Sequence, residues 1–161
     1  MLTSLNRLIG QPVVWEGRQL GYVERAVADT KHRCLSGIII RRGIGSARWA
    51  PLDGILMAGR LCVVLSAQPV RLPKQETADI RRAVFTSGQS AGEVCDVIIR
   101  ADTLRIAALE VSQGPFYRLL GRCGYACAFG QSDGSRADEV VVGPLLTWTQ
   151  LLRQLGEEAE A

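Results

Sequence analysis

The chain has 161 residues, of which 47% are hydrophobic and 22% charged, a composition typical of a globular protein and not of a disordered or fibrous one. Its formal net charge of +3 is too small to indicate nucleic-acid binding by itself. No stretch approaches the roughly 20 apolar residues that a membrane-spanning helix needs. Residues 1–11 lack the apolar core of a signal peptide, so we expect a cytoplasmic location and no membrane span.

The first predicted elements are short strands. Strands are expected over residues 13–15, 21–28 and 35–41, and the last of these is rich in isoleucine, a residue that favours strands. The polar stretch 29–33 is typical of a turn. A further apolar strand, 61–65, completes this part of the chain.

The same plan returns 71 positions later. This shift carries Gly17 onto Gly88 and Gly21 onto Gly92, and the apolar positions follow it without a gap over residues 13–43. It also places Val13 on Val84. Such agreement at one shift indicates an internal duplication. Alternation along the strands then predicts four core residues on matching faces, namely Ile38, Ile40, Leu109 and Val111.

The rest of the chain connects and closes these strands. Residues 67–82 contain two prolines and predict a linker that ends in a short polar turn or helix over 75–82. A strand is expected over 139–142, and apolar residues at 145, 148, 152 and 155 after Pro144 predict a short amphipathic helix.

The predicted fold class is all-β, with two tandem small barrels, because closure removes the exposed edges of short strands. The predicted division is a first barrel over 1–66, a linker over 67–82, a second barrel over 83–143, and a C-terminal helix and tail over 144–161.

The motifs of the first copy resemble those of the PRC-barrel family. They run LIGQPVVWEGRQLGYVERAVAD, then LSGIIIRRG, then RWAPLDGIL, and the second copy carries GEVCDVIIRADTLRIAALEVSQG. The resemblance covers roughly residues 5–66 and 83–143, and it implies two PRC-type barrels. Members of that family include the C-terminal domain of the ribosome-maturation factor RimM, the cytoplasmic domain of the photosynthetic reaction-centre H subunit, and small sporulation proteins. The resemblance implies a module that docks on a protein or ribonucleoprotein and has no catalytic site.

Catalytic, cofactor and metal motifs are not found in the sequence. His32 is the only histidine, and it lies in a predicted turn, where a solvated side chain is the ordinary interpretation. The five cysteines are odd in number, and Cys123 and Cys127 form a C-x-x-x-C pair with no second pair, so we expect reduced, metal-free thiols. The expectation is therefore a non-enzymatic protein without a cofactor.

The distribution of charge suggests one kind of partner. Residues 1–66 hold nine Lys/Arg and four Asp/Glu, a net of +5, whereas residues 85–161 hold six and ten, a net of −4. A basic first half could face RNA or a ribosome, with a patch formed by Arg41, Arg42, Arg48 and Trp49. The alternative is a solvated strand end beside a core tryptophan.

The segment 114–136 suggests another kind of partner. It is longer than its counterpart in the first copy and is predicted to be irregular, yet it is rich in aromatic and aliphatic residues. Its candidate protein-binding residues are Phe116, Tyr117, Arg118 and Arg122. The alternative is that the segment plugs its own barrel.

From these observations we expect a non-catalytic adaptor or scaffold that binds another protein. The alternative is an RNA- or ribosome-associated factor that uses the basic first half. The sequence leaves the oligomeric state open.

Overall fold

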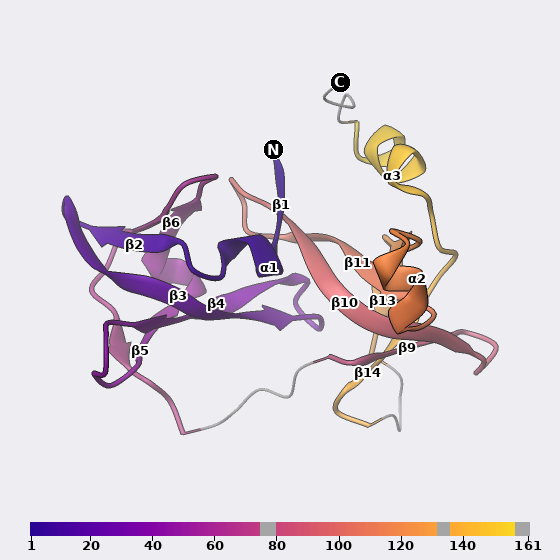
Figure 1. Cartoon of the computed structure of the whole chain (residues 1–161), viewed down its shortest axis with the longest axis horizontal. Coiled ribbons are helices and arrows are strands. Elements are labelled where there is room, and N and C mark those ends of the chain that lie inside the picture. Colours follow the sequence, from indigo (N-terminus) through magenta and orange to yellow (C-terminus); the bar gives the residue numbers. More distant parts are fainter. Residues whose placement is uncertain (75–79, 132–135, 157–161) are drawn as a thin grey trace. The chain divides into compact units, whose positions relative to one another are not determined.

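The structure is a computed structural model that describes residues 1–74, 80–131 and 136–156. It is mostly β, with two sheets, one of them curved into a half-barrel, and a short C-terminal helix, which confirms the predicted all-β class (Figure 1). The chain divides into two compact units. The first contains Met1–Thr77 together with Ile99–Ile106, and the second contains Ala78–Ile98 and Ala107–Ala161.

The first unit is built on a sheet with the strand order β6-β7-β2-β3-β4-β5-β8. Strand β2 pairs antiparallel with β3 and parallel with β7. The β2–β7 pair brings together parts of the chain that are distant in sequence. The elements of this part of the chain are β1 (Leu2–Ser4), α1 (Leu5–Leu8), β2 (Pro12–Trp15), β3 (Arg18–Asp29), β4 (Cys34–Arg41), β5 (Arg48–Pro51), the 3₁₀ turn η1 (Leu52–Gly54), β6 (Ile55–Ala58), β7 (Val63–Leu65) and β8 (Val70–Arg71).

The core of the first unit lies on one face of this sheet. Ile38 and Ile40 of β4 are buried there as predicted, together with Val13 of β2 and Val23 of β3. The hairpin tip Ile99–Ile106 also belongs to this unit. Its Leu104 carbonyl accepts a hydrogen bond from the Leu35 amide at 2.8 Å.

The second unit carries the strand order β12-β11-β10-β9-β14-β13, and β1 also pairs with β10, whose last two residues lie in the first unit. Its core includes the predicted residues Leu109 and Val111, both almost fully buried. The elements are β9 (Arg82–Phe85), β10 (Ser90–Arg100), β11 (Ile106–Ser112), α2 (Pro115–Leu119), β12 (Gly124–Ala126), β13 (Phe129–Gly130), β14 (Glu139–Val142) and α3 (Trp148–Leu155).

The two sheets repeat the same local geometry. A Cβ on Gly21 would lie 2.5 Å from the carbonyl oxygen of Arg41, and a Cβ on Gly92 would overlap the carbonyl oxygen of Ser112. Both the glycines and the carbonyls are 71 positions apart. The sequence therefore needs glycine at equivalent places, because the neighbouring strand passes too close for any side chain.

The predicted alignment of the first strands is wrong by one residue. Val13 pairs with Gly21, but Gly92 pairs with Ala83 and not with Val84. Ala83 and Val13 are both fully buried, whereas Val84 is half-buried. Val13 and Gly21 are eight positions apart in the sequence, whereas Ala83 and Gly92 are nine apart, and a gap-free shift cannot accommodate that difference.

The connecting segment and the C-terminal helix also differ in detail from the predictions. Val70–Arg71 of the predicted linker forms β8 at an edge of the first sheet, while most of the predicted turn or helix over 75–82 lies outside the described residues. Helix α3 begins at Trp148, later than predicted, because Thr147 and Gln150 form a capping box at its start. No helix among the described residues is long and apolar enough to cross a membrane. The predicted domain boundaries stay a prediction.

Candidate functional site

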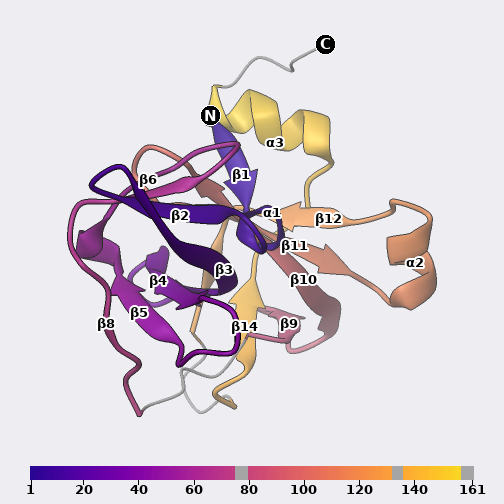
Figure 2. The same ribbon diagram turned by 60° about the vertical axis from the view of Figure 1, so that its left-hand side comes forward.

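The segment 114–136 is more regular than predicted, and its extra residues are confined to one loop. In the second unit Leu109 pairs with Ala126, as Ile38 pairs with Ala50 in the first, so β12 takes the place of β5. Residues 132–135 of the segment lie outside the described residues. The longer connection is residues 113–123, eleven residues against the six of 42–47, and we call it the α2 loop. It extends away from β11 and β12 (Figure 2).

Hydrogen bonds within the chain hold the α2 loop in a defined shape. The Ser112 hydroxyl donates to the Gly114 carbonyl at 2.8 Å, at the point where the chain leaves β11. The Arg122 amide donates to the Tyr117 carbonyl at 2.8 Å, which fixes the return of the chain after α2. Gly114 and Gly121 both have positive φ, at 154° and 66°, and so supply the sharp bends at the two ends.

The α2 loop exposes four large apolar side chains. Phe116 is 78% exposed, Leu119 83%, Leu120 68% and Tyr117 44%, and helix α2 contains no buried residue. The side chains of this helix therefore do not plug the barrel. The four predicted partner-binding residues are all exposed on the α2 loop, namely Phe116, Tyr117, Arg118 and Arg122.

The sequence prediction missed Leu119 and Leu120 as members of this surface. Their signal was present, because both lie in an apolar stretch bounded by Gly114 and Gly121. The predicted set leaves them out because tyrosine and arginine are the residues favoured as interface anchors.

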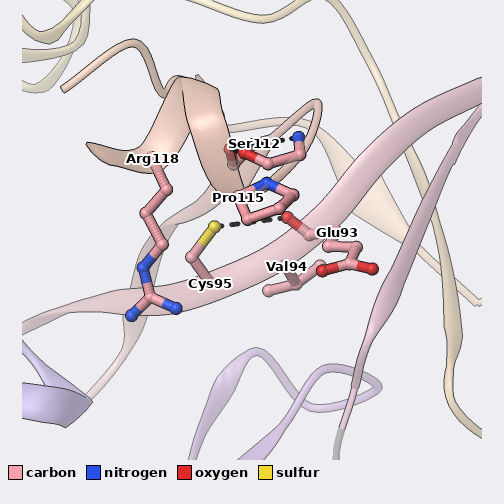
Figure 3. Close-up of a pocket in the computed structure, with 7 residues that line it drawn as sticks. Glu93, Val94, Cys95, Ser112, Pro115 and Arg118 are labelled. Carbon is pink, nitrogen blue, oxygen red and sulfur yellow. Dashed lines mark hydrogen bonds between the residues drawn. The ribbon is translucent and has the colours of Figure 1, made fainter. Parts of the chain in front are cut away.

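A shallow hollow of about 120 Å³ lies at the base of the α2 loop, within the second unit. It is lined by Glu93, Val94, Cys95, Ser112, Gly114, Pro115 and Arg118. Figure 3 shows the Arg118 side chain reaching from the helix towards the strand that carries Cys95. The Cys95 thiol donates to the Glu93 carbonyl at 3.4 Å.

The electrostatics at this base do not favour nucleophilic chemistry. Burial, together with the nearby Glu110 carboxylate, raises the pKa of the Cys123 thiol to about 11. Burial also raises the pKa of Cys95, against the opposing effect of the Arg118 charge. Burial and Glu110 raise the pKa of Tyr125 to about 12. A thiol that keeps its proton at neutral pH is a poor nucleophile.

The remaining candidates for chemistry are scattered. His32 Nδ1 lies 2.6 Å from Asp29 Oδ2 in an exposed turn. None of the five cysteines, all of which lie in the described ranges, forms a disulfide bond. In the described part of the chain, no group of three or more His, Cys, Asp or Glu side chains is placed to hold a metal ion.

The predicted RNA-facing patch is divided by the strand geometry. Arg41 makes a two-point ion pair with Glu24, with Nε–Oε2 and Nη2–Oε1 distances of 2.9 Å. Trp49 lies against Gly37, where a Cβ would overlap its indole ring, and is half-buried. Arg48 precedes Trp49 in β5 and therefore leaves the opposite face. Arg42 and Arg48 remain exposed.

No family model matches this sequence, and no curated protein matches it either.

Proposed function

We propose that this chain is a tandem of PRC-type barrel units that acts as a non-catalytic adaptor and binds another protein through its α2 loop. The observation that carries the proposal is the exposure of Phe116, Leu119 and Leu120 on a short helix with no buried residue. Contiguous exposed apolar surface is unfavourable in water, and it commonly marks an interaction site.

The shape and charge of the α2 loop indicate the chemistry of the partner. The loop projects from its strands, so it fits a partner that offers a groove (Figure 2). Residues 113–123 include Arg118 and Arg122 and no carboxylate. A groove with an apolar floor and acidic residues at its rim would bury the apolar side chains and pair with both arginines.

The hydrogen-bonded backbone of the α2 loop supports this proposal. The hydrogen bonds from Ser112 and Arg122 hold the loop in one conformation before binding. The loop then loses less conformational entropy on association than a mobile loop would lose.

The PRC-type assignment is supported by the repeated strand plan. Both units contain a parallel pair at the same place, Val13 with Val63 and Ala83 with Val140. Both also contain the close glycine–carbonyl approach at Gly21 and Gly92. The raised pKa values of Cys95 and Cys123 support the non-catalytic part of the proposal.

The test is affinity purification with three tagged forms of the full chain. The first is wild type, and the second is a Phe116→Ser/Leu119→Ser variant that keeps the loop and its arginines. The third is Leu61→Ser, a matched control at a side chain that is 84% exposed on the first unit. Central apolar anchors contribute about 2 kcal/mol or more, so the double variant should lose its partner at least about thirtyfold while the control retains it.

Two results would contradict the proposal. One is a double variant that retains every partner of wild type at unchanged affinity. The other is a double variant that converts a wild-type dimer into monomers, because the occupant of the loop would then be a second copy of this chain.

A further inference from the structure

The excess positive charge of the chain is concentrated in its first unit. Over Met1–Thr77 and Ile99–Ile106 there are thirteen Lys/Arg and six Asp/Glu, a net of +7. Over Ala78–Ile98 and Ala107–Ala161 there are six and ten, a net of −4. A unit of this size with a net charge of +7 attracts polyanions over several ångströms of solvent.

Two arginines of the first unit lie directly opposite each other on neighbouring strands. Arg48 of β5 is in register with Arg71 of β8, and on its other side with Ile40 of β4. Opposite residues in an antiparallel pair leave the same face of the sheet, with Cα atoms about 4.5 to 5.5 Å apart. Like charges placed in this way are destabilising. A pair of guanidinium groups at this position is therefore unfavourable unless an anion lies between them.

Arg42 adds a third charge at the same end of these strands. It follows the last residue of β4, and its carbonyl accepts a hydrogen bond from the Gly45 amide at 3.1 Å in the loop that leads to β5. All three arginines are exposed. We call Arg42, Arg48 and Arg71 the arginine cluster. The order of β4, β5 and β8 can be followed in Figure 2.

The cluster is not neutralised by carboxylates. Within residues 1–74, 80–131 and 136–156, none of its three side chains has an ion-pair or hydrogen-bond partner. Arg41 differs in this respect, because Glu24 pairs with its guanidinium. The neighbouring positive charge on β4 is therefore neutralised, while the cluster is left available for another anion.

We propose that the arginine cluster binds the phosphate backbone of a nucleic-acid strand. Guanidinium groups match phosphate oxygens in a two-point geometry, which favours phosphodiesters over carboxylates as the ligand. The three groups are exposed and spread over two strands and a loop. Such an arrangement fits an extended polyanion with several charges and not one enclosed small anion. Stacking on Trp49 is not involved, since its ring leaves the other face of β5.

The experiment measures binding of the full chain to a short labelled single-stranded RNA by fluorescence anisotropy, from about 50 to about 200 mM salt. Three phosphate contacts predict a slope of log K against log salt near −2, from about −0.7 for each contact on a single strand. The Arg48→Gln/Arg71→Gln variant should reduce the slope to about −0.7. Its thermal midpoint should stay at or above that of wild type, because a like-charge pair has been removed.

The matched control is Lys31→Gln. Lys31 is an exposed cation of the same unit in the turn before β4, whereas the cluster lies at the end of β4. The Lys31→Gln variant should keep the wild-type slope of log K against log salt. A single-stranded DNA of the same sequence identifies the natural strand: equal binding indicates contacts to phosphate alone, and preference for RNA indicates added contacts to the 2′-hydroxyl.

Several results would overturn the proposal. One is the absence of RNA binding by the wild-type chain at about 50 mM salt. Equal losses in the double variant and in Lys31→Gln would show an effect of net charge and not of the cluster. Polyglutamate or anionic lipid vesicles that bind as tightly as RNA would identify a different class of partner.

Discussion

The sharpest stability prediction concerns Gly92, where the second unit brings two backbones together. A Cβ at this position would overlap the Ser112 carbonyl oxygen and lie 2.8 Å from its carbonyl carbon. Both atoms belong to the backbone of a paired strand, so no side-chain rotation can relieve the overlap. Gly92 also has a φ of 128°, a conformation that alanine adopts only with strain.

The cost of Gly92→Ala follows from these two effects. Overpacking of a tight site costs about 1 to 3 kcal/mol. Backbone strain of this kind costs a further 1 to 3 kcal/mol, roughly. The free energy of unfolding should therefore fall by about 4 kcal/mol, which is a large part of the roughly 5 to 15 kcal/mol that stabilises an ordinary domain. For a chain of this length, the thermal midpoint should drop by about 8 to 16 °C.

The assay is urea unfolding followed by tryptophan fluorescence and circular dichroism. Gly21→Ala should show a similar loss, because its Cβ would lie 2.5 Å from the Arg41 carbonyl oxygen. Gly130→Ala is the matched control, since a Cβ there meets nothing within 4 Å and its φ is not positive. It should be neutral, or stabilising by less than about 1 kcal/mol. If Gly92→Ala unfolds within about 1 kcal/mol of Gly130→Ala, the reasoning from close backbone approach is wrong.

The cores, the helix cap and the half-buried Cys123 thiol give three more testable outcomes. Truncation of any of the four buried strand residues to alanine should cost about 2 to 5 kcal/mol by urea unfolding, and unchanged midpoints in all of them would contradict the core assignment. These residues are Ile38, Ile40, Leu109 and Val111. Thr147→Ala removes a capping box and should cost about 1 kcal/mol, with faster amide exchange in α3; equal exchange would refute the role of the cap. Because the pKa of Cys123 is raised from 9.0 to about 11, the folded state holds this proton more tightly, so its contribution to stability is present below pH 9 and is lost between pH 9 and 11. The lower thiolate fraction outweighs the higher nucleophilicity of that thiolate, so iodoacetamide should modify Cys123 about tenfold more slowly in the folded than in the urea-unfolded chain at pH 8; equal rates would contradict the shift.

The strands were predictable because their signals are local. Alternation of apolar residues in β4 and β11 specifies the buried face, and Ile38 and Leu109 occupy it as expected. The strand over 139–142 was predicted with the bounds it has in the structure. The duplication was visible because glycines at Gly21 and Gly92 are required by the same backbone contact.

Long-range pairing was not predictable from the same signals. Arg71 lay in a segment with two prolines and no strand pattern, and it becomes part of β8 only because β5 offers an open edge. The true equivalence of Val13 and Ala83 is hidden in the sequence, because the gap-free shift of 71 aligns Val13 with another valine, Val84. The start of α3 depended on the cap at Thr147, and the apolar pattern of the helix does not reveal it.

The exposure of the α2 loop was beyond sequence reasoning for a different reason. A stretch such as Phe116–Leu120 reads equally well as a barrel plug and as a surface, because apolar composition does not say which face of a loop is covered. The structure decides the matter, because helix α2 contains no buried residue and the loop extends away from β11 and β12 (Figure 2).

Both proposed binding surfaces include the same connection of the repeated fold. The α2 loop connects β11 to β12, and Arg42 and Arg48 flank the equivalent connection between β4 and β5. The strands on either side are fixed by their buried residues, Ile38 and Ala50 in one copy and Leu109 and Ala126 in the other. The connection itself buries little and so can change in length and charge at small cost in stability. After duplication, one copy could therefore acquire arginines at this position and the other an apolar helix of five residues, while both kept the same core.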